Sequence, residues 1–237
     1  MKYLSALVFC SCLLAQDAQP EATTAAPVAQ PGGYQQYGTQ DKKRILGIMP
    51  NFRTTSVNAK DIVKLSSGDK FKLAARDAFD PGAFFTTAIL TGISHWQQQY
   101  YPAIPLGAKG YGERYGLNFL DNTSSTFLSE AIIPSITHQD PRYFRLGEGS
   151  IKKRLGYSLS RLLIARSDSG KWVVNGGQLG GGFAAGALAN LYYPASQRSV
   201  ENTFIRFGIN LGTDGLSNLG REFWPDIAKL MSRHKKP

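Results

Sequence analysis

Apolar side chains follow a helical period from Lys70 onward. In the stretch "FDPGAFFTTAILTGISHWQQQYYP", Asp80 suits an N-cap, and Pro81 stands at the first helical position, where its missing N–H costs nothing. Apolar and small residues then recur at steps of three and four: Phe85, Ala88, Ile89, Gly92, Ile93 and Trp96. The pattern predicts a helix that begins at Pro81.

Three more segments show the same period. One covers about 110–133, the second is "SIKKRLGYSLSRLLIARS", and the last begins at Ser199 as N-cap. A proline disfavours the helical region for the residue before it. We therefore expect the first of these helices to end before Pro134 and the last to end at Pro225.

The stretch "WVVNGGQLGGGFAAGALANLYYP", from Trp172 to Pro194, contains no charged residue and allows three interpretations. The first is a nucleotide-binding loop, because residues 180–185 match G-x-G-x-x-A. That motif works where a strand delivers the chain to a tight turn inside a βαβ unit. No βαβ alternation surrounds this copy, so the sequence disfavours nucleotide binding, and we expect no cofactor.

A second interpretation is a helix that another backbone approaches closely. Small residues fall at steps of four along the stretch, and the last helix carries glycines of its own. A glycine inside a helix costs about 1 kcal/mol relative to alanine, and a ribbon of small residues offsets that cost by allowing close approach. We expect the two helices to pack tightly on each other through Gly177, Gly181, Ala185, Ala189, Gly208 and Gly212.

The third interpretation is a membrane span. Residues 172–197 and 81–108 lack Lys, Arg, Asp and Glu, and both windows exceed the length that crosses a bilayer. Both also hold several amide and hydroxyl side chains, and the mean hydropathy of the chain is −0.23. The sequence therefore favours a soluble or peripheral all-α fold over an embedded one, a compact helical bundle of about four to six helices with glycine-rich close packing.

The N-terminal region divides into segments of different composition. Residues 1–15 resemble a signal peptide with both cysteines inside it, and 16–42 form a Pro/Gln/Ala linker that cannot bury enough apolar surface to order itself. We expect 43–69 to be an extended arm or docking segment, 70–232 to be the helical domain, and 233–237 to be a basic tail. The mature chain would then be exported and free of cysteine.

The charge of the chain is strongly positive. Its 27 Lys+Arg outnumber its 17 Asp+Glu, for a formal net charge of +10. In the periplasm or cell envelope the available polyanions are lipid headgroups and wall polymers rather than nucleic acid. The expected partner is therefore an anionic envelope surface, with membrane association possible, or a partner protein; no nucleic acid is expected.

The densest polar constellation is "ITHQDPRYFR". His138 and Asp140 have the composition of a general-base pair, and Arg142 with Tyr143 would hold an anionic substrate. The structural alternative is a turn in which Asp140, before Pro141, caps the backbone. Neither a G-x-S-x-G nucleophile motif nor a paired-histidine metal motif accompanies the segment, so no metal site is expected.

The stretches "KKRILGIMPNFR", "HQDPRYFR", "RSDSGK", "NLYYP" and "EFWPDI" occur in this order. Together they resemble an uncharacterised family of exported bacterial proteins, over about residues 43–227. The resemblance implies one continuous domain and brings no activity with it. Two hypotheses follow: a non-enzymatic structural or binding domain of the cell envelope, or an envelope hydrolase or transferase that uses His138 with Asp140 and Arg142.

Overall fold

The computed structural model describes residues 53–57, 64–97 and 104–233. The expected signal peptide, the linker, most of the expected arm and the basic tail after Arg233 lie outside these ranges. Tyr100 and Tyr101, at the end of the stretch that begins with Phe79, also lie outside the described ranges.

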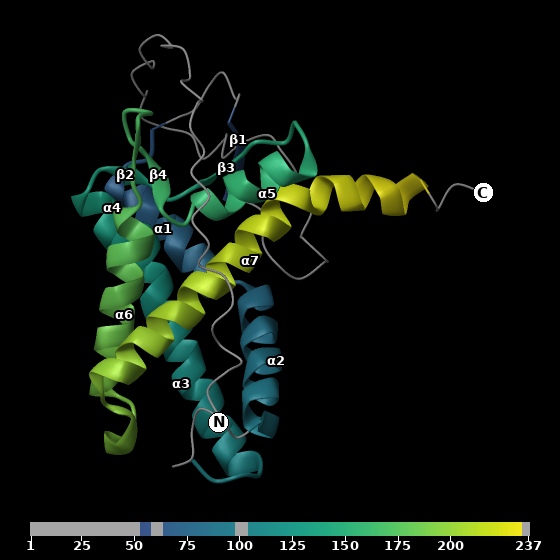
Figure 1. Cartoon of the computed structure of the whole chain (residues 1–237). Coiled ribbons are helices and arrows are strands. Elements are labelled where there is room, and N and C mark those ends of the chain that lie inside the picture. Colours follow the sequence, from purple (N-terminus) through teal and green to yellow (C-terminus); the bar gives the residue numbers. More distant parts are fainter. Residues whose placement is uncertain (1–52, 58–63, 98–103, 234–237) are drawn as a thin grey trace.

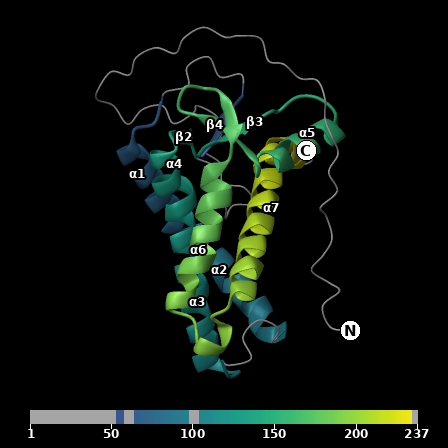
Figure 2. The ribbon, with the colours of Figure 1, turned by 60° about the vertical axis from the view of Figure 1, so that its left-hand side comes forward.

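The described chain is mostly helical, which confirms the predicted fold class (Figures 1 and 2). The helix α2 packs on α3, and α6 lies along α7, which crosses the whole bundle. The main helices are α1 (Ser67–Ala78), α2 (Pro81–Gln97), α3 (Ala108–Phe127), α5 (Ile151–Ser160), α6 (Gly182–Leu188) and α7 (Val200–Arg233).

Local chemistry fixes where these helices begin. Ser66 accepts a hydrogen bond from the Asp69 N–H, and the Asp69 side chain accepts one from the Ser66 N–H, a capping box that starts α1. The Asp80 carboxylate accepts from the Gly82 N–H at 2.7 Å, so α2 begins at Pro81 as predicted.

The helix after α2 does not end before Pro134. A π-helical turn, η1 (Leu128–Ile132), follows α3 without a break, and α4 (Ile133–Ile136) follows that. Pro134 is the second residue of α4 and directly follows the π-helical turn, where the regular hydrogen-bond pattern of the α-helix is already interrupted. The proline is therefore tolerated, and the expected stop is wrong.

The last helix does not end at Pro225 either. It continues to Arg233, and its ribbon changes direction toward the C-terminal end (Figure 1). In the turn before the proline, the carbonyl of Glu222 accepts from Arg145 Nε at 2.9 Å and from Arg154 Nη2 at 2.5 Å. Side-chain donors thus satisfy the backbone that an internal proline disturbs.

Short strands gather at one end of the bundle (Figure 2). The helix expected over "SIKKRLGYSLSRLLIARS" stops at Ser160, and its end forms a strand. That strand pairs antiparallel with its neighbours on both sides. A parallel pair joins a second small sheet, in which Thr54 faces Tyr143. The strands are β1 (Thr54–Ser56), β2 (Gln139–Asp140), β3 (Tyr143–Arg145), β4 (Ile164–Ser167) and β5 (Trp172–Val174).

The glycine-rich stretch is helical and packs closely on two elements, the expected last helix α7 and also η1. It forms the π-turn η2 (Gly177–Gly181) and then α6. A Cβ on Gly177 would lie 2.6 Å from the Ser129 carbonyl oxygen, and one on Gly181 would lie 2.6 Å from the Ser129 Cα, so this ribbon packs on η1. Ala185 and Ala189 are buried beside it.

The predicted role of Gly208 and Gly212 is wrong. A Cβ on either residue would meet nothing within 4 Å, because both face outward from α7. The contact between α6 and α7 uses Gly186 instead, where an added Cβ would lie 2.8 Å from the Thr203 carbonyl oxygen.

Apolar side chains cover the outside of the strand-free half of the bundle. On α2, Thr87 and Thr91 face inward while Trp96 is 82% exposed. We name this surface the apolar belt: Phe84, Phe85, Ile89, Leu90, Ile93, Trp96, Phe183, Leu188, Leu191, Val200, Phe204, Ile205, Ile209 and Leu216. None of the helices in the described ranges has both the length and the apolar character that crossing a membrane requires.

Candidate functional site

The "HQDPRYFR" segment folds into a turn between β2 and β3, and the expected His138–Asp140 pair does not form. His138 is exposed and has a positive φ of 52°. The Asp140 carboxylate binds Arg142 instead, with Nε at 3.0 Å and Nη2 at 2.6 Å, and caps the Arg142 N–H. This is the turn alternative that the sequence left open.

Arg142 and Tyr143 do not present free groups to a substrate. The Arg142 guanidinium is buried against Asp140. The Tyr143 hydroxyl donates to Glu222 Oε2 at 2.9 Å, and its side chain is buried. Burial, followed by the charge of Glu222, raises the pKa of Tyr143 above its ordinary value. Both residues tie the turn to the rest of the fold.

Next to this turn, arginine and aromatic side chains alternate in a row. Arg166 lies 4.8 Å from the ring centroid of Phe144 and 5.1 Å from that of Trp172. Arg161 lies 4.2 Å from the Trp172 ring and 4.5 Å from the Tyr157 ring. We call these five residues the arginine–aromatic stack. The pairing of β4 with β5, which sets Arg166 opposite Trp172, builds its centre.

The stack forms part of the wall of a cavity of about 60 Å³, here called the small cavity. Its other walls come from the "HQDPRYFR" turn, from η1 and from amide side chains. Five residues of this lining are Arg53, Ser129, Glu130, Arg161 and Arg166. Each of them has a buried side-chain nitrogen or oxygen without a hydrogen-bond partner.

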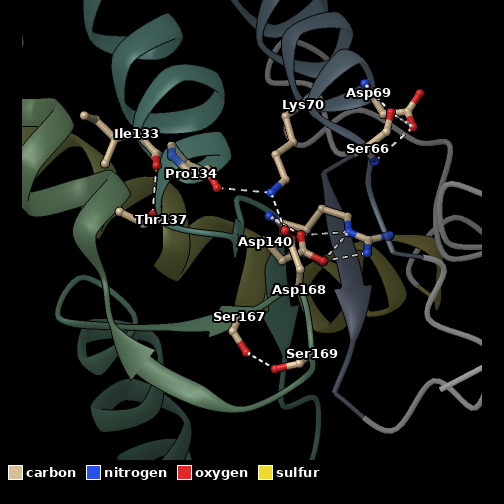
Figure 3. A network of polar contacts seen from close by, with 11 residues as sticks. Ser66, Asp69, Lys70, Ile133, Pro134, Thr137, Asp140, Ser167, Asp168 and Ser169 are labelled. Atoms are coloured by element: carbon tan, nitrogen blue, oxygen red, sulfur yellow. Dashed lines mark hydrogen bonds and ion pairs between the residues drawn. The ribbon is translucent and has the colours of Figure 1, made fainter. Parts of the chain in front are cut away.

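A buried ion pair supports the same region from α1. Lys70 is 1% exposed, and its Nζ donates to Asp168 Oδ2 at 2.8 Å and to the Pro134 carbonyl at 3.1 Å (Figure 3). Asp168 follows β4, and its N–H donates to the His138 carbonyl. The pair therefore joins α1, α4 and the turn after β4.

A second, larger cavity of about 450 Å³ lies between α2, α3 and α7 and is here called the central cavity. Most of its lining carries hydroxyl, amide or charged groups, and four apolar side chains of the belt also border it: Leu90, Ile93, Ile205 and Ile209. Four polar side chains at steps of four residues along α7 line this cavity: Asn202, Arg206, Asn210 and Asp214.

Asp121 in the central cavity explains the "YYP" that ends the glycine-rich stretch. The hydroxyls of Tyr192 and Tyr193 donate to its two oxygens at 2.5 and 2.6 Å. Burial raises the pKa of Asp121, although both hydrogen bonds and the charge of Arg206 oppose the rise. The paired tyrosines thus fasten the end of α6 to α3.

Burial also shifts the pKa values of two further charged side chains in the central cavity, Arg221 and Asp214. Burial lowers the pKa of Arg221 to about 10, and the positive charge of Arg53 acts in the same direction. Burial raises the pKa of Asp214, whose carboxylate accepts from the Gln178 amide. Arg221 Nε is sealed without a hydrogen-bond partner.

Sequence reasoning missed both the stack and the central cavity. Arg161 and Arg166 fall in the segment for which the periodicity predicts one helix, and the change from helix to strand at Ile164 leaves no periodic signal over so few residues. The local clue was the turn at 167–170 followed by "WVV", which indicates a hairpin.

The described residues hold no group of three or more His, Cys, Asp or Glu side chains that could bind a metal ion. No family model, no curated protein and no solved structure matches the chain.

Proposed function

We propose that this chain is a non-enzymatic binding domain of the cell envelope that docks on a lipid bilayer through its apolar belt. The main support for this proposal comes from α2, in which polar side chains are buried and large apolar side chains are exposed. Thr87 and Thr91 face the interior, whereas the side chains of Phe84, Phe85, Ile89 and Trp96 are exposed on the outside. Exposed apolar patches of this extent mark interaction surfaces rather than ordinary solvated surface.

The outward surface of this half is also nearly free of charge, which favours lipid over a polar partner. Residues 81–97 contain no Lys, Arg, Asp or Glu, and neither does α6. Within the first half of α7, Arg206 and Asp214 turn inward and bind other side chains, and Glu201 in the first turn is exposed. A hydrocarbon phase accepts such a face, because few charged groups have to be desolvated.

Basic side chains flank the belt at the strand-bearing end. Lys152 and Lys153 are exposed on α5. Lysines beside an inserted apolar surface attract anionic headgroups, each by about 1 kcal/mol. The anionic surface expected from the charge of the chain is thus a lipid surface in this proposal, and export follows from the signal-like N-terminus and the family resemblance.

The hydrolase or transferase hypothesis receives no comparable support. It needed a carboxylate beside the His138 ring, and the carboxylate of Asp140 is engaged by Arg142. The anion-holding role of Arg142 meets the same obstacle, because its guanidinium is already paired.

The test is flotation of the full chain with phosphatidylcholine vesicles, with and without phosphatidylglycerol. The chain should float with both, anionic lipid should strengthen binding, and high salt should remove only the added part. A double variant, Phe85→Ser with Ile89→Ser, should bind at least about tenfold more weakly, because each buried apolar side chain contributes about 1.5–3 kcal/mol.

The matched control is Ile151→Ser with Val174→Ser, which removes two apolar side chains that are even more exposed, from the strand-bearing end. This variant should bind like the unmodified chain. Complete release by salt, or equal loss in both double variants, would contradict docking through the belt. A dimer that forms without vesicles and dissociates in the Phe85/Ile89 variant would mean that a second copy covers this surface.

A further inference from the structure

Unsatisfied polar atoms are concentrated around the small cavity. Arg53 Nε, Arg161 Nη1 and Arg166 Nε are buried donors without partners, and Ser129 Oγ is a buried hydroxyl without one. Leaving one such group unpaired costs about 1–3 kcal/mol, and more for a charged one. A cavity that collects four of them at one place has the chemistry of a binding site for an acceptor-rich group.

The arginine side chains of the cavity wall favour a negatively charged group as the ligand. Within the described ranges, Arg161 has no carboxylate partner and donates only to Ser160 Oγ, and Arg166 has neither an ion pair nor a hydrogen bond from its side chain. Burial lowers the pKa of Arg161, and the neighbouring positive charge of Arg166 lowers it further. Two partly buried guanidinium groups that contact the same Trp172 ring repel each other, and a bound anion would relieve this repulsion.

The size of the cavity limits the anion. One water-sized group needs about 10–15 Å³ of such space, so about 60 Å³ holds roughly four to six. A tetrahedral oxyanion, with a central atom and four oxygens, has this size. A nucleotide or a sugar does not fit.

One hydrogen-bond acceptor in the cavity wall favours protonated phosphate over sulfate as the bound anion. Glu130 Oε2 is buried without a partner, although its other oxygen pairs with Arg53. A sulfate oxygen would be repelled there, because sulfate carries no proton at neutral pH. Hydrogen phosphate and a protonated phosphomonoester carry an O–H that can donate to this oxygen. The result is a charge-assisted hydrogen bond, which is stronger than one between neutral groups.

We propose that the small cavity binds one protonated phosphate group, held by Arg53, Arg161, Arg166 and Ser129, with Glu130 accepting its hydroxyl. The group is either free inorganic phosphate or the phosphomonoester headgroup of a lipid. Arg161, Arg166 and Trp172 are half-buried, so this wall reaches the surface and gives a route of entry.

Thermal unfolding and calorimetric titration of the full chain with sodium phosphate test the site. Phosphate should raise the melting temperature more than sodium chloride or sodium sulfate at equal ionic strength. Arg166→Gln and Arg161→Gln should each weaken phosphate binding by about ten- to a hundredfold, as expected for a lost charge-assisted hydrogen bond.

Lys171→Gln is the matched control, because it removes one exposed positive charge beside Trp172 without touching the cavity. It should leave phosphate binding unchanged. Glu130→Gln should narrow the preference for phosphate over sulfate, since an amide can donate to a sulfate oxygen. Equal stabilisation by chloride, or equal weakening by Lys171→Gln, would overturn the site.

Vesicles distinguish the two sources of the phosphate group. If a lipid headgroup is the ligand, phosphatidic acid should bind the full chain more tightly than phosphatidylglycerol, whose diester has no P–O–H, and free phosphate should compete. If free phosphate is the ligand, the two lipids should bind alike while phosphate still stabilises the chain. This experiment is independent of belt docking, because phosphatidylcholine vesicles report on the belt alone.

Discussion

The Glu222 carboxylate of α7 and the Arg154 guanidinium of α5 meet in the interior, with Oε1 and Nε 2.8 Å apart. Glu222 is fully buried, and its carboxylate also accepts from the N–H groups of Leu146 and Gly147 and from the Tyr143 hydroxyl. One carboxylate therefore joins α7 to α5, to β3 and to the loop that follows β3.

Glu222→Gln should lower the free energy of unfolding by about 3–5 kcal/mol, because it removes the charge that compensates buried Arg154. Asp226 also pairs with Arg154, at 2.5 Å, but its side chain is 40% exposed. Asp226→Asn should cost about 1 kcal/mol or less. Urea unfolding of both variants measures the difference, and equal losses would show that burial does not set the strength of this network.

Two glycine substitutions should have opposite effects. Gly181→Ala places a Cβ 2.6–2.8 Å from backbone atoms of Leu128 and Ser129. Backbone cannot yield as a flexible side chain can, so we expect a loss of about 1–3 kcal/mol or more. Gly208→Ala meets nothing within 4 Å inside a helix and should gain up to about 1 kcal/mol. Thermal unfolding compares them, and a loss at Gly208 would mean that another surface packs there.

The helices could be predicted from the sequence because their signals are local. The cap at Asp80 and the steps of three and four after it place α2 correctly. The same periodicity gives no information about which side faces inward, and here the apolar side faces out. The expected stop at Pro134 was wrong because a π-helical turn precedes this proline, and the expected stop at Pro225 was wrong because two arginine side chains bind the Glu222 carbonyl.

The site could be predicted only in part. The Asp140 turn is visible in the sequence, because an aspartate before a proline caps its own backbone. The partners that surround it are distant along the chain. Arg166 reaches the turn because β4 pairs with β2, which sets Asp140 opposite Arg166. A pairing across this distance has no signature in local periodicity, so the small cavity appears only in the structure.

The ion pair of Lys70 and Asp168 allows a double-mutant cycle. Lys70→Met should cost about 3–5 kcal/mol, because it leaves the Asp168 carboxylate, whose side chain is 7% exposed, without its cation. Asp168→Asn in the same chain should recover part of that loss, with a coupling energy of about 0.5–3 kcal/mol. Urea unfolding of the single and double variants gives this energy. Strictly additive losses would show that the two side chains stabilise the fold independently.

Asp214 predicts a pH dependence of stability. Burial raises its pKa above the ordinary value of 3.8, against the opposing effects of the Gln178 hydrogen bond and of Arg53 and Arg221, while Asp77 adds to the rise. A raised pKa means that the folded chain binds this proton more tightly than the unfolded chain. The resulting stability is fully present below pH 3.8 and is lost as the pH rises through the folded pKa.

Asp214→Asn keeps an oxygen for Gln178 and removes the titration. Relative to the unmodified chain, this variant should therefore become more stable as the pH rises from about 4 toward neutrality. Chemical unfolding at several pH values measures the difference between the two chains. Ser217→Ala, which alters the same cavity wall without a titrating group, should show a difference that does not change with pH. An Asp214→Asn difference that stayed constant or decreased as the pH rose would show that Asp214 is ionised at least as easily in the fold as in water.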